Sequence, residues 1–384
     1  MRRVRTFLLV ILALAICPGA FAAGRVAGGL ARQDVTRSTG MRNDALRLLA
    51  EHYYRRVDPR LLDGRSLHDL SRALSDPYTQ VLTPDLVAKR DQNESGHYAG
   101  IGVHLTQTGH GVRIDSVRAH GPAARAGIRP GDVIVGVNGR TVRGLRVDPL
   151  GERLRGRAGS RVTIQIRRGI LFETRRLTRA ELPLTLVRAR LVGRTGVIGL
   201  TEFASGASRK VRAAARRLIA RGASRLVLDL RANPGGYVKE ALGTAGVFLP
   251  RGAVVARESG LHWRPVVLHT RTHPVTTHLP LAVLVNGESA SAAEIVSGAL
   301  RDHRRARLIG SRTFGKGVIQ DVFPLPGGSE LKLTIAEYHT PAGTVIQHRG
   351  LAPDVVSYDD ARTAGDDVLA RAIGALRARP SRGN

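Results

Sequence analysis

The amino-acid sequence predicts a mixed α/β protein (α+β in the wider sense) that is built from several domains. With 384 residues, the chain is longer than most single domains. Apolar runs of strand length alternate with amphipathic helical patterns through residues 181–357, an order that favours a layered α/β core. Glycine turns and alternating strand patterns fill residues 97–180, and helical stripes occur in residues 40–95. We therefore expect an N-terminal helical segment, a strand-rich domain and an α/β core.

The features of a secretory signal are present in residues 1–23. Three arginines lie among the first five residues, an apolar run follows over residues 7–17, and Ala20-Phe21-Ala22 has the small-x-small pattern of a cleavage site. We expect export to the periplasm or cell envelope. An uncleaved membrane anchor is the alternative, although the run is short for a spanning helix. Cys17 is the only cysteine, so the mature chain would hold no disulfide and must rely on packing.

The chain is strongly basic. Its formal net charge of +29, from 60 basic and 31 acidic residues, would suit nucleic acid, an anionic envelope polymer or a membrane surface. Arginines are, however, spread through every segment, and no nucleic-acid motif or aromatic platform accompanies them. We therefore expect no nucleic-acid partner.

The segment 40–95 is predicted to be helical. An apolar stripe at helical spacing begins at Ala45 and continues to Tyr53, and a proline follows it. Ser66 is a candidate N-cap for a second helix that reaches Leu74.

Several segments of residues 97–180 carry strand and turn signals. Tyr98-Ala-Gly-Ile-Gly-Val103 is a glycine loop before a strand, Asn138-Gly139 signals a hairpin, and the stretch 162–166 alternates apolar and polar residues. Together with the glycine-flanked run 121–135, these segments resemble the core of a PDZ domain.

The PDZ resemblance implies a peptide site. Gly100, Ile101, Gly102 and Val103 would receive the carboxyl terminus of a protein substrate on backbone N–H groups, and the peptide would add as an extra strand. The alternative is that the domain only packs or gates, because a glycine loop alone does not establish an open groove.

Strand–turn–helix alternation predicts the α/β core over residues 181–357. A helix over 208–221 precedes a buried strand at 226–230, and Asn233-Pro-Gly-Gly236 then turns the chain into another helix. Residues 358–384 are predicted to form a last helix and a loose tail.

The most informative stretch of this core begins at Leu281. Five apolar residues, 281–285, predict a buried strand, Asn286-Gly287 predicts a turn, and a helical pattern follows. Ser291 lies at the start of that helix, beside N–H groups that have no helical partner. Those groups and the helix dipole suit a developing oxyanion, so Ser291 is a candidate nucleophile.

A serine hydroxyl needs a base, and no histidine is obviously placed to serve. Lys316 lies in Phe314-Gly-Lys-Gly317, whose neighbours are small or apolar. Burial there would lower the lysine pKa toward neutrality, and a neutral lysine can accept the serine proton. Gln320, four residues on, could orient the amine by hydrogen bonding.

Other interpretations of these motifs exist. Ser291-Ala-Ala-Glu294 also fits a helix capping box. The run from Gly310 to Lys316 resembles a phosphate-binding loop, but Gly317 replaces the Ser or Thr that would hold Mg²⁺, and residues 318–323 resemble a strand where a helix is required.

A group of histidines raises the question of a metal. His262, His269, His273 and His278 lie in a proline-rich stretch, without a closely spaced ligand pair and nearby acid. We expect a solvated loop and no metal, with a zinc site as the alternative.

Two motifs carry a family resemblance. Ser289-Ala-Ser-Ala-Ala-Glu294 and Thr313-Phe-Gly-Lys-Gly317, followed by Gln320, resemble the carboxyl-terminal processing (tail-specific) serine protease family. The resemblance implies that Ser291 is the nucleophile, Lys316 the base and Gln320 the supporting amide.

The resemblance also suggests an oxyanion site. The turn 233–236 is similar to the family's oxyanion segment. Its glycines would let the N–H of Gly235 or Gly236 point at the tetrahedral intermediate, with the N–H of Ala292 as the second donor.

Shorter matches extend the resemblance. The run Asp76–Pro84 is similar to a signature that the family carries before its peptide-binding domain, and Gly350–Asp354 is similar to its closing motif. The chain departs from the pattern at Ala293, where serine or glycine is more usual, and at Ile319, where valine is usual. Neither departure touches the proposed chemistry.

The sequence therefore predicts an exported serine endopeptidase that needs no cofactor. It would bind protein C-termini through its PDZ domain and cleave upstream peptide bonds. A non-catalytic PDZ scaffold that holds envelope proteins is one alternative, and an unrelated hydrolase or lyase on a similar core is another.

Overall fold

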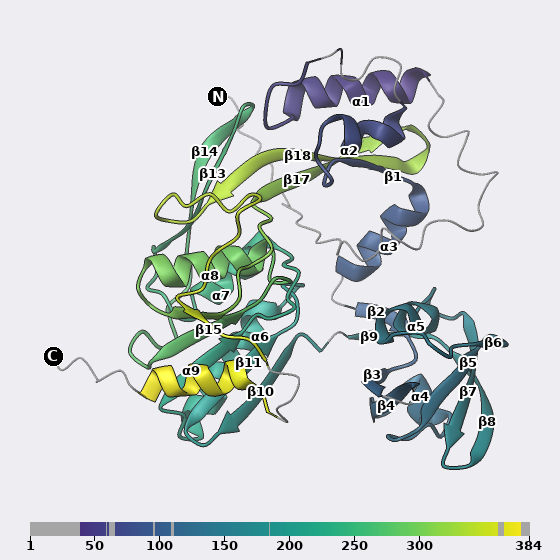
Figure 1. Ribbon diagram of the computed structural model, residues 1–384. Coiled ribbons are helices and arrows are strands. Elements are labelled where there is room, and N and C mark those ends of the chain that lie inside the picture. The colour runs from purple at the N-terminus through teal and green to yellow at the C-terminus, as the bar shows by residue number, and fades with distance from the viewer. Residues whose placement is uncertain are drawn as a thin grey trace, which may run out of the picture. The chain divides into compact units, whose positions relative to one another are not determined.

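The computed structural model in Figure 1 describes residues 39–58, 60, 66–94, 97–108, 111–183, 185–359 and 365–377. The expected signal or anchor (1–23) and the end of the expected tail lie outside the described residues. The chain divides into two compact units, one of residues 88–184 and the other of residues 1–87 with 185–384. The domain bounds drawn from the sequence remain predictions.

The unit of residues 88–184 is built on a strand-rich sheet with the order β3-β4-β5-β7-β8, in which β6 also pairs with β5. A second pair, β2 with β9, is antiparallel. The elements are β2 (His97–Gly100), β3 (Val103–Thr108), β4 (Gly111–Val117), α4 (Pro122–Arg125), β5 (Val133–Val137), β6 (Arg140–Thr141), α5 (Val147–Leu154), β7 (Arg161–Arg168), β8 (Leu171–Thr178) and β9 (Ala180–Pro183).

Period-2 alternation explains the core of this unit. Val162, Ile164 and Ile166 of β7 are fully buried, because they all point to the same side of the strand. They pack with Leu150 of α5 and Ile114 of β4 in one aliphatic cluster. The near absence of aromatic residues in this cluster follows from an aromatic content of 4%.

The larger unit contains a six-stranded sheet with the order β10-β11-β12-β15-β16-β19. The β10–β11 pair is antiparallel and the other pairs are parallel. The strands are β10 (Val187–Val192), β11 (Thr195–Leu200), β12 (Arg225–Asp229), β15 (Leu281–Val285), β16 (Arg307–Gly310) and β19 (Val355–Val356).

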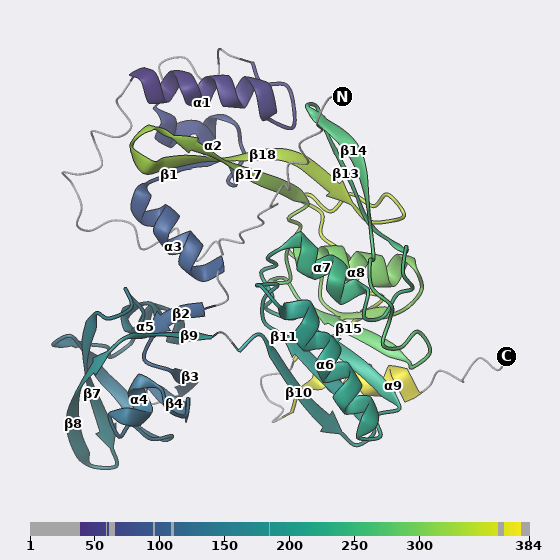
Figure 2. The same cartoon turned by 180° about the vertical axis from the view of Figure 1, so that it is seen from behind.

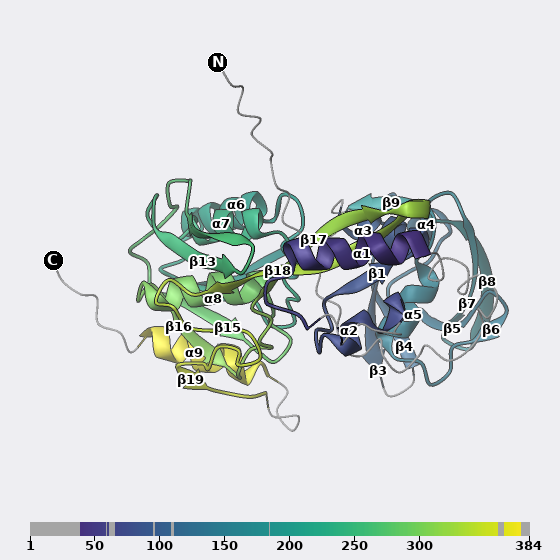
Figure 3. The same cartoon turned by 90° about the horizontal axis from the view of Figure 1, so that it is seen from above.

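Helices cover both faces of this sheet. Figure 3 shows α6 (Ala207–Ala220), α7 (Val238–Ala245) and α8 (Ala292–Asp302) on one side of it and α9 (Asp367–Arg377) on the other. Double coverage explains why the strand 281–285 reads as five consecutive apolar residues, all of them buried. On the α9 side, Ala282 and Leu284 pack with Leu369 and Ala372.

A second sheet of this unit has the order β1-β18-β13-β14, with β17 also paired to β18. Its strands are β1 (Gln80–Leu82), β13 (Val254–Gly260), β14 (Trp263–His269), β17 (Val318–Leu325) and β18 (Ser329–His339). Figures 1 and 2 show α1 (Thr39–His52) lying across β17 and β18.

The prediction that residues 40–95 are helical is therefore wrong at one place. Helices α1, α2 (Leu70–Ala73) and α3 (Pro84–Glu94) are present, but Gln80–Leu82 forms strand β1. That strand finds its antiparallel partner in β18, near the other end of the chain, and local periodicity carries no information on so distant a partner. Among the described residues, no helix is both long and apolar enough to cross a membrane.

Candidate active site

Ser291 lies at the tight connection between β15 and α8. Its backbone has φ 55° and ψ −116°, a conformation that residues with side chains seldom adopt. Such strain persists only where surrounding contacts enforce it, and it gathers at functional sites. The Ser291 hydroxyl is buried and has no partner of hydrogen-bonding geometry in the described part of the chain. A poised, unsatisfied hydroxyl on a strained turn suits a nucleophile.

Two hydrogen bonds to neighbouring segments hold the turn before Ser291. The Ser289 hydroxyl donates to the carbonyl of Leu230 at 2.8 Å. The N–H of Ala290 donates to the carbonyl of Asn233 at 3.0 Å. Both acceptors belong to the loop after β12, so the two loops are fixed to each other.

Glu294 joins the serine to the lysine loop. Its buried carboxylate accepts the N–H of Ser291 at 2.9 Å, the Thr313 hydroxyl at 2.5 Å, the N–H of Gly315 at 2.8 Å and the N–H of Lys316 at 2.9 Å. One oxygen, Oε2, takes both the Ser291 and Lys316 bonds, so these two backbone nitrogens lie no further apart than the two bond lengths together. Burial raises the pKa of Glu294, and the four donors oppose that rise.

The capping interpretation of Ser291 and Glu294 is also correct. The capping-box pairing is present, and its well-formed hydrogen bond is the one from the Ser291 N–H to the carboxylate. In the other half of the box the Ser291 side chain faces the backbone N–H of Glu294 as an acceptor. The hydroxyl proton stays available, so capping does not exclude a nucleophilic role.

The Lys316 side chain is buried, with 1% of its surface exposed. Burial first, and then the repulsion of Lys332, hold the pKa of the Lys316 ammonium well below its usual value, against the attraction of Asp76 and Glu294. The Tyr78 ring lies over the amine, with Nζ 4.8 Å from the ring centroid. A lysine in this setting is neutral over part of the range in which an exposed lysine is charged.

A second contact fixes the lysine backbone. The Tyr338 hydroxyl donates to the carbonyl of Lys316 at 2.5 Å. With the N–H of Lys316 bound to Glu294, both backbone polar groups of this residue are satisfied, and the direction in which its side chain leaves the loop is set.

Gln320 lies on β17 and is fully buried. Its Nε2 donates to the Thr334 hydroxyl at 3.5 Å. Its Oε1 has no partner of hydrogen-bonding geometry within the described ranges. The Thr334 N–H in turn donates to the Thr79 hydroxyl at 3.1 Å, and that hydroxyl donates to Asp76 at 2.7 Å. The amide is thus part of a polar chain that reaches the N-terminal segment.

Of the predicted oxyanion residues, Gly235 and Ala292 lie at Ser291, whereas Gly236 does not. Gly235 has φ 103°, and a side chain there would come within 2.8 Å of the Ser291 Cβ and 3.1 Å of the Ala292 nitrogen. The Gly235 N–H donates to Asn233 Oδ1 at 2.9 Å, so a role as oxyanion donor would require that bond to break. Gly236 has φ 136° and lies against the backbone of Phe203.

An arginine braces the start of this loop. Arg231 pairs with Asp229 and Asp366 at 2.7 Å each, and with Asp359 at 3.3 Å. Asp366 also accepts the N–H of Leu369 at 2.8 Å in the first turn of α9. The C-terminal helix is therefore tied to the loop that lies behind Ser291.

Sequence reasoning missed several residues of this site. Tyr78 and Asp76 belong to the run Asp76–Pro84, which was noted only as a weak signature, while Tyr338 and Thr334 carried no signal in their alternating strand. Their roles depend on the pairing of β1 with β18.

The predicted peptide loop lies in the unit of residues 88–184. Gly100 ends β2, Val103 begins β3, and Gly102 between them has φ 81°, which glycine tolerates best. The carbonyls of Ile101 and Gly102 accept the N–H groups of Ala123 and Arg118 at 2.9 Å each. Strand β3 is an edge strand of its sheet, which is the position where a peptide can add.

The four histidines do not form a cluster. His262 lies between β13 and β14, His269 ends β14, and His273 and His278 lie in the connection to β15. In the described ranges, no group of three His, Cys, Asp or Glu side chains is placed to hold a metal ion.

A buried serine on a strand–turn–helix connection and a buried lysine of lowered pKa are thus linked, through their backbone N–H groups, by one glutamate carboxylate. Residues 194–357 match the model of peptidase family S41, and residues 113–168 match that of the PDZ domain. The chain is thus similar to peptidase family S41 in its larger unit and to the PDZ domain in the unit of residues 88–184.

Individual relatives agree with this family. A probable CtpA-like serine protease of Staphylococcus aureus is 32% identical over 328 residues, which cover 85% of this chain and 66% of that protein. The chain thus spans just under two thirds of that relative. The solved photosystem II D1 C-terminal processing protease is 28% identical with a TM-score of 0.55, covering 83% of this chain and 93% of its own. A Streptococcus agalactiae lipoprotein, 14% identical with a TM-score of 0.52 over 88% and 96% of the two chains, shares the fold.

Proposed function

We propose that the protein is a serine endopeptidase of the carboxyl-terminal processing type, with Ser291 as nucleophile and Lys316 as base. The observation that carries the proposal is the shared carboxylate. One oxygen of Glu294 binds the backbone of both residues, at 2.9 Å each, while the lysine amine is buried and its pKa is lowered. The match to the model of peptidase family S41 and the similarity to a probable CtpA-like serine protease support the same reaction class.

The proposed reaction begins with neutral Lys316, which takes the proton of the Ser291 hydroxyl as Oγ attacks the scissile carbonyl carbon. The tetrahedral oxyanion is stabilised by the N–H of Ala292 and by a glycine N–H of the 233–236 turn. The lysine ammonium then gives its proton to the leaving amine, and an acyl-enzyme remains. Water hydrolyses the ester in the second half, with Lys316 again accepting and returning the proton.

Gln320 is proposed as a positioning residue for the amine. The buried, unsatisfied Oε1 offers an acceptor for a lysine N–H, and Thr334 holds the other end of the amide. The function of the amide is then to aim the lone pair of Lys316 at the serine.

The central experiment compares wild type, Ser291→Ala and Lys316→Met in a casein digestion over a range of pH. Methionine keeps the volume and apolar stem of lysine but cannot accept a proton, so turnover should fall by about 10³-fold or more. In the wild type, turnover should rise as pH increases through the lowered pKa of Lys316, at lower pH than for an ordinary lysine. Lys210→Met, on the exposed side of α6, is the matched lysine control.

Thermal melting separates chemistry from folding. The Lys316→Met protein should melt at or above the wild-type temperature, because removing a buried charge relieves a desolvation cost. Full activity in either active-site variant would reject the dyad. A wild type that binds C-terminal peptides but never cleaves them would favour the non-catalytic scaffold.

The PDZ domain is proposed to select substrates by their carboxyl termini through residues 100–103. Glycine at positions 100 and 102 lets the peptide carboxylate approach backbone N–H groups. Ser291→Ala protein should bind peptides with a free C-terminus at least tenfold more tightly than the same peptides with an amidated C-terminus. Equal affinity for both, measured by fluorescence anisotropy, would reject this role.

The site of action is proposed to be the cell envelope. This rests on the signal-like composition of residues 1–23. Fractionation of cells that produce the full chain should find the protein outside the cytoplasm, either free or in the membrane fraction. A wholly cytoplasmic protein would contradict the proposal.

A further inference from the structure

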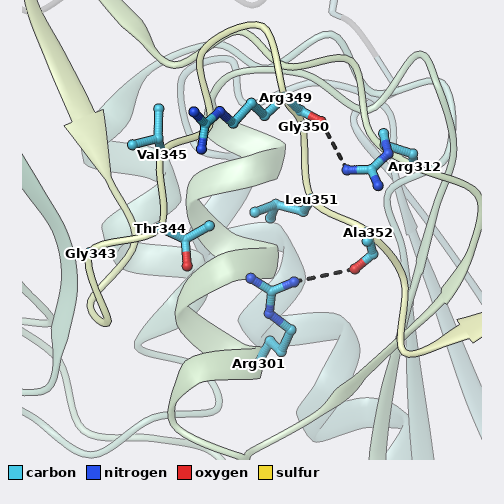
Figure 4. A pocket seen from close by; sticks show the side chains of 9 residues that line it. All are labelled: Arg301, Arg312, Gly343, Thr344, Val345, Arg349, Gly350, Leu351 and Ala352. Carbon is cyan, nitrogen blue, oxygen red and sulfur yellow. Dashed lines mark hydrogen bonds between the residues drawn. The ribbon is translucent and has the colours of Figure 1, made fainter.

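A pocket of about 420 Å³ lies in the larger unit. It adjoins residues 311–317, which carry Lys316 and are called the base loop below. Three of its lining residues are arginines that come from different segments: Arg301 from the last turn of α8, Arg312 from the loop after β16, and Arg349 from the loop after β18. Figure 4 shows them around Leu351. The remaining lining residues are glycines, small apolar residues and Thr344, which adds a hydroxyl. None of the lining residues in the described ranges is acidic.

The neighbouring contacts leave this positive charge poorly compensated. Within the described residues, the carboxylate that pairs with these arginines is Asp302, which lies 3.6 Å from Arg301 Nε and also accepts the N–H of Ala342. The arginine hydrogen bonds run to backbone carbonyls, from Arg301 to Ala352 at 3.2 Å and from Arg312 to Arg349 at 3.1 Å. These bonds orient the guanidinium groups but do not neutralise them. Like charges in one concave site repel each other, and a bound anion would remove that cost.

Carbonyl bonds of this kind preorganise the pocket. A guanidinium carries five N–H donors in a planar fork, so one bond to a carbonyl leaves the others available. Arginine forks match the geometry of phosphate and bind it with two parallel bonds. The guanidinium groups of Arg301 and Arg312 are each held by one such carbonyl bond. Less conformational entropy of these side chains is therefore lost when a ligand binds.

We propose that this pocket binds a phosphate-class oxyanion, either as a free anion or as the headgroup of an anionic lipid. The volume accommodates a phosphate with part of an attached group. The proposed peptidase chemistry does not use Arg301, Arg312 or Arg349, so the site is additional to the proposed catalytic one.

The location gives the ligand a route to the base loop. One wall of the pocket contains Gly350 and Leu351, and two hydrogen bonds join it to Thr313. The Thr313 N–H donates to the Leu351 carbonyl at 3.1 Å, and the Leu351 N–H donates to the Thr313 hydroxyl at 2.6 Å. That hydroxyl is the one that donates to Glu294. The His348 N–H also donates to the Gly315 carbonyl at 2.9 Å. An anion held by Arg312 and Arg349 therefore rests on the same wall that supports Lys316.

This wall of the pocket packs closely against the base loop, so neither can move without the other. Gly350 has φ 61°, and a side chain there would come within 2.2 Å of the Thr313 carbonyl oxygen. A Cβ atom added at Gly315 would lie 2.9 Å from the backbone nitrogen of Gly350 and 3.1 Å from that of Arg349. A shift of the pocket wall must consequently move the base loop with it.

The test is titration calorimetry of the full chain with inorganic phosphate, at ionic strength kept constant with sodium chloride. The wild type should bind one phosphate saturably. Arg312→Gln with Arg349→Gln should weaken binding at least tenfold. The matched control, Arg251→Gln with Arg307→Gln, removes the same charge from exposed positions elsewhere in the unit and should change affinity less than twofold.

A second arm identifies the source of the anion. Flotation with phosphatidylcholine vesicles, with and without 30% phosphatidylglycerol, shows whether a lipid headgroup occupies the pocket. Vesicle binding that the Arg312/Arg349 pair reduces and the control pair preserves assigns the lipid, whereas pocket-dependent binding of inorganic phosphate alone assigns the free anion. Equal loss in both double variants, or no saturable binding in either arm, would overturn the proposal, because only the overall charge would then be at work. Circular dichroism of each variant confirms that it is folded.

Discussion

Two buried glutamates of the same unit have opposite surroundings. Glu294, at the turn that carries Ser291, is fully buried and accepts four hydrogen bonds from four residues. Glu258, on β13, is 3% exposed and accepts one bond from Trp263 at 3.2 Å, and its Oε1 has no hydrogen-bond partner among the described residues. Burial raises the pKa of Glu258 to about 6. The Glu294 carboxylate thus anchors the backbones of Ser291 and Lys316. The Glu258 carboxylate is buried with a single hydrogen-bond donor among the described residues.

The comparison shows what burial of a charge can accomplish. A carboxylate with a full set of donors fixes the backbone around it, because removing it would strand every donor. A carboxylate with one donor fixes little and makes stability depend on pH. Substitution of Glu294 should therefore affect mainly turnover, and substitution of Glu258 mainly the pH dependence of stability. Substitution of the carboxylates that pair with Arg231 (the Arg231 brace) should affect mainly stability.

The largest effect is expected at Glu294. Glu294→Gln keeps the shape but replaces one acceptor oxygen with an NH₂ group, which faces backbone N–H donors and repels them. Displacement of the Ser291 and Lys316 backbones by even about 1 Å should lower kcat by about 100-fold, with a smaller change in KM. Steady-state kinetics against wild type measures both.

Glu258→Gln serves as the matched control for this change, because it makes the same chemical substitution at a buried strand position. Its kcat should stay within about twofold of wild type, a range that corresponds to less than ~0.5 kcal/mol. Similar losses of kcat in both variants would contradict the anchoring role of Glu294.

A smaller effect is expected at the Arg231 brace. Asp366→Asn removes a charge partner that lies 2.7 Å from Arg231 and weakens the tie between α9 and the loop behind Ser291. Loss of a partly buried charged hydrogen bond should reduce the free energy of unfolding by about 1.5–3 kcal/mol, as urea denaturation would show.

Asp359→Asn is the control for this brace. Asp359 is about half exposed and lies 3.3 Å from Arg231, so its loss should cost no more than about 1 kcal/mol. An Asp366→Asn protein as stable as Asp359→Asn would show that α9 is held by its apolar face alone.

The smallest effect is expected at Glu258 and depends on pH. The folded pKa, about 6, is raised above the ordinary value of 4.5, so the folded state holds the proton more tightly than the unfolded state does. The stability that this proton contributes is present below about pH 4.5 and is lost as pH rises through about 6. Glu258→Gln, which is neutral throughout, should therefore be more stable than wild type at pH 8 by about 2 kcal/mol and nearly equal to it at pH 4.5.

Urea unfolding of both proteins at the two pH values measures this difference. Subtracting one protein from the other cancels the titration of groups that they share. A difference that does not change with pH would mean that Glu258 is ionised at its ordinary pKa despite its burial.

Local patterns predicted a large part of this fold. The strand 281–285, the helix after Ser291 and the strand from Val318 were all recognised, because each has its periodicity within a short window. The burial of Lys316 was also predictable, since its glycine and apolar neighbours leave no polar surroundings for the amine. The catalytic and oxyanion residues proposed from the sequence lie in the larger unit, and the proposed peptide-binding residues 100–103 lie in the unit of residues 88–184.

The features that were not predicted depend on contacts between residues far apart in the sequence, which a short stretch of sequence cannot show. Strand β1 was assigned to a helical segment because Gln80-Val81-Leu82 has no alternation long enough to indicate a strand. Its partner in β18 supplies the missing hydrogen bonds. For the same reason the sequence did not place Tyr78 above Lys316, nor foresee that Glu294, identified as a helix cap, would also hold the lysine loop.

The pairing of β1 with β18 has a consequence for when the site can first exist. Thr79 and Thr334 are 255 positions apart in the chain, and the whole unit of residues 88–184 is synthesised between them. A nascent polypeptide that has emerged only as far as β17 already contains Ser291 and Lys316, but its N-terminal strand has nothing to pair with. Closing so long a loop is among the slow steps of folding. The surroundings that lower the pKa of the Lys316 amine, which include Lys332 of β18, are therefore completed only near the end of synthesis.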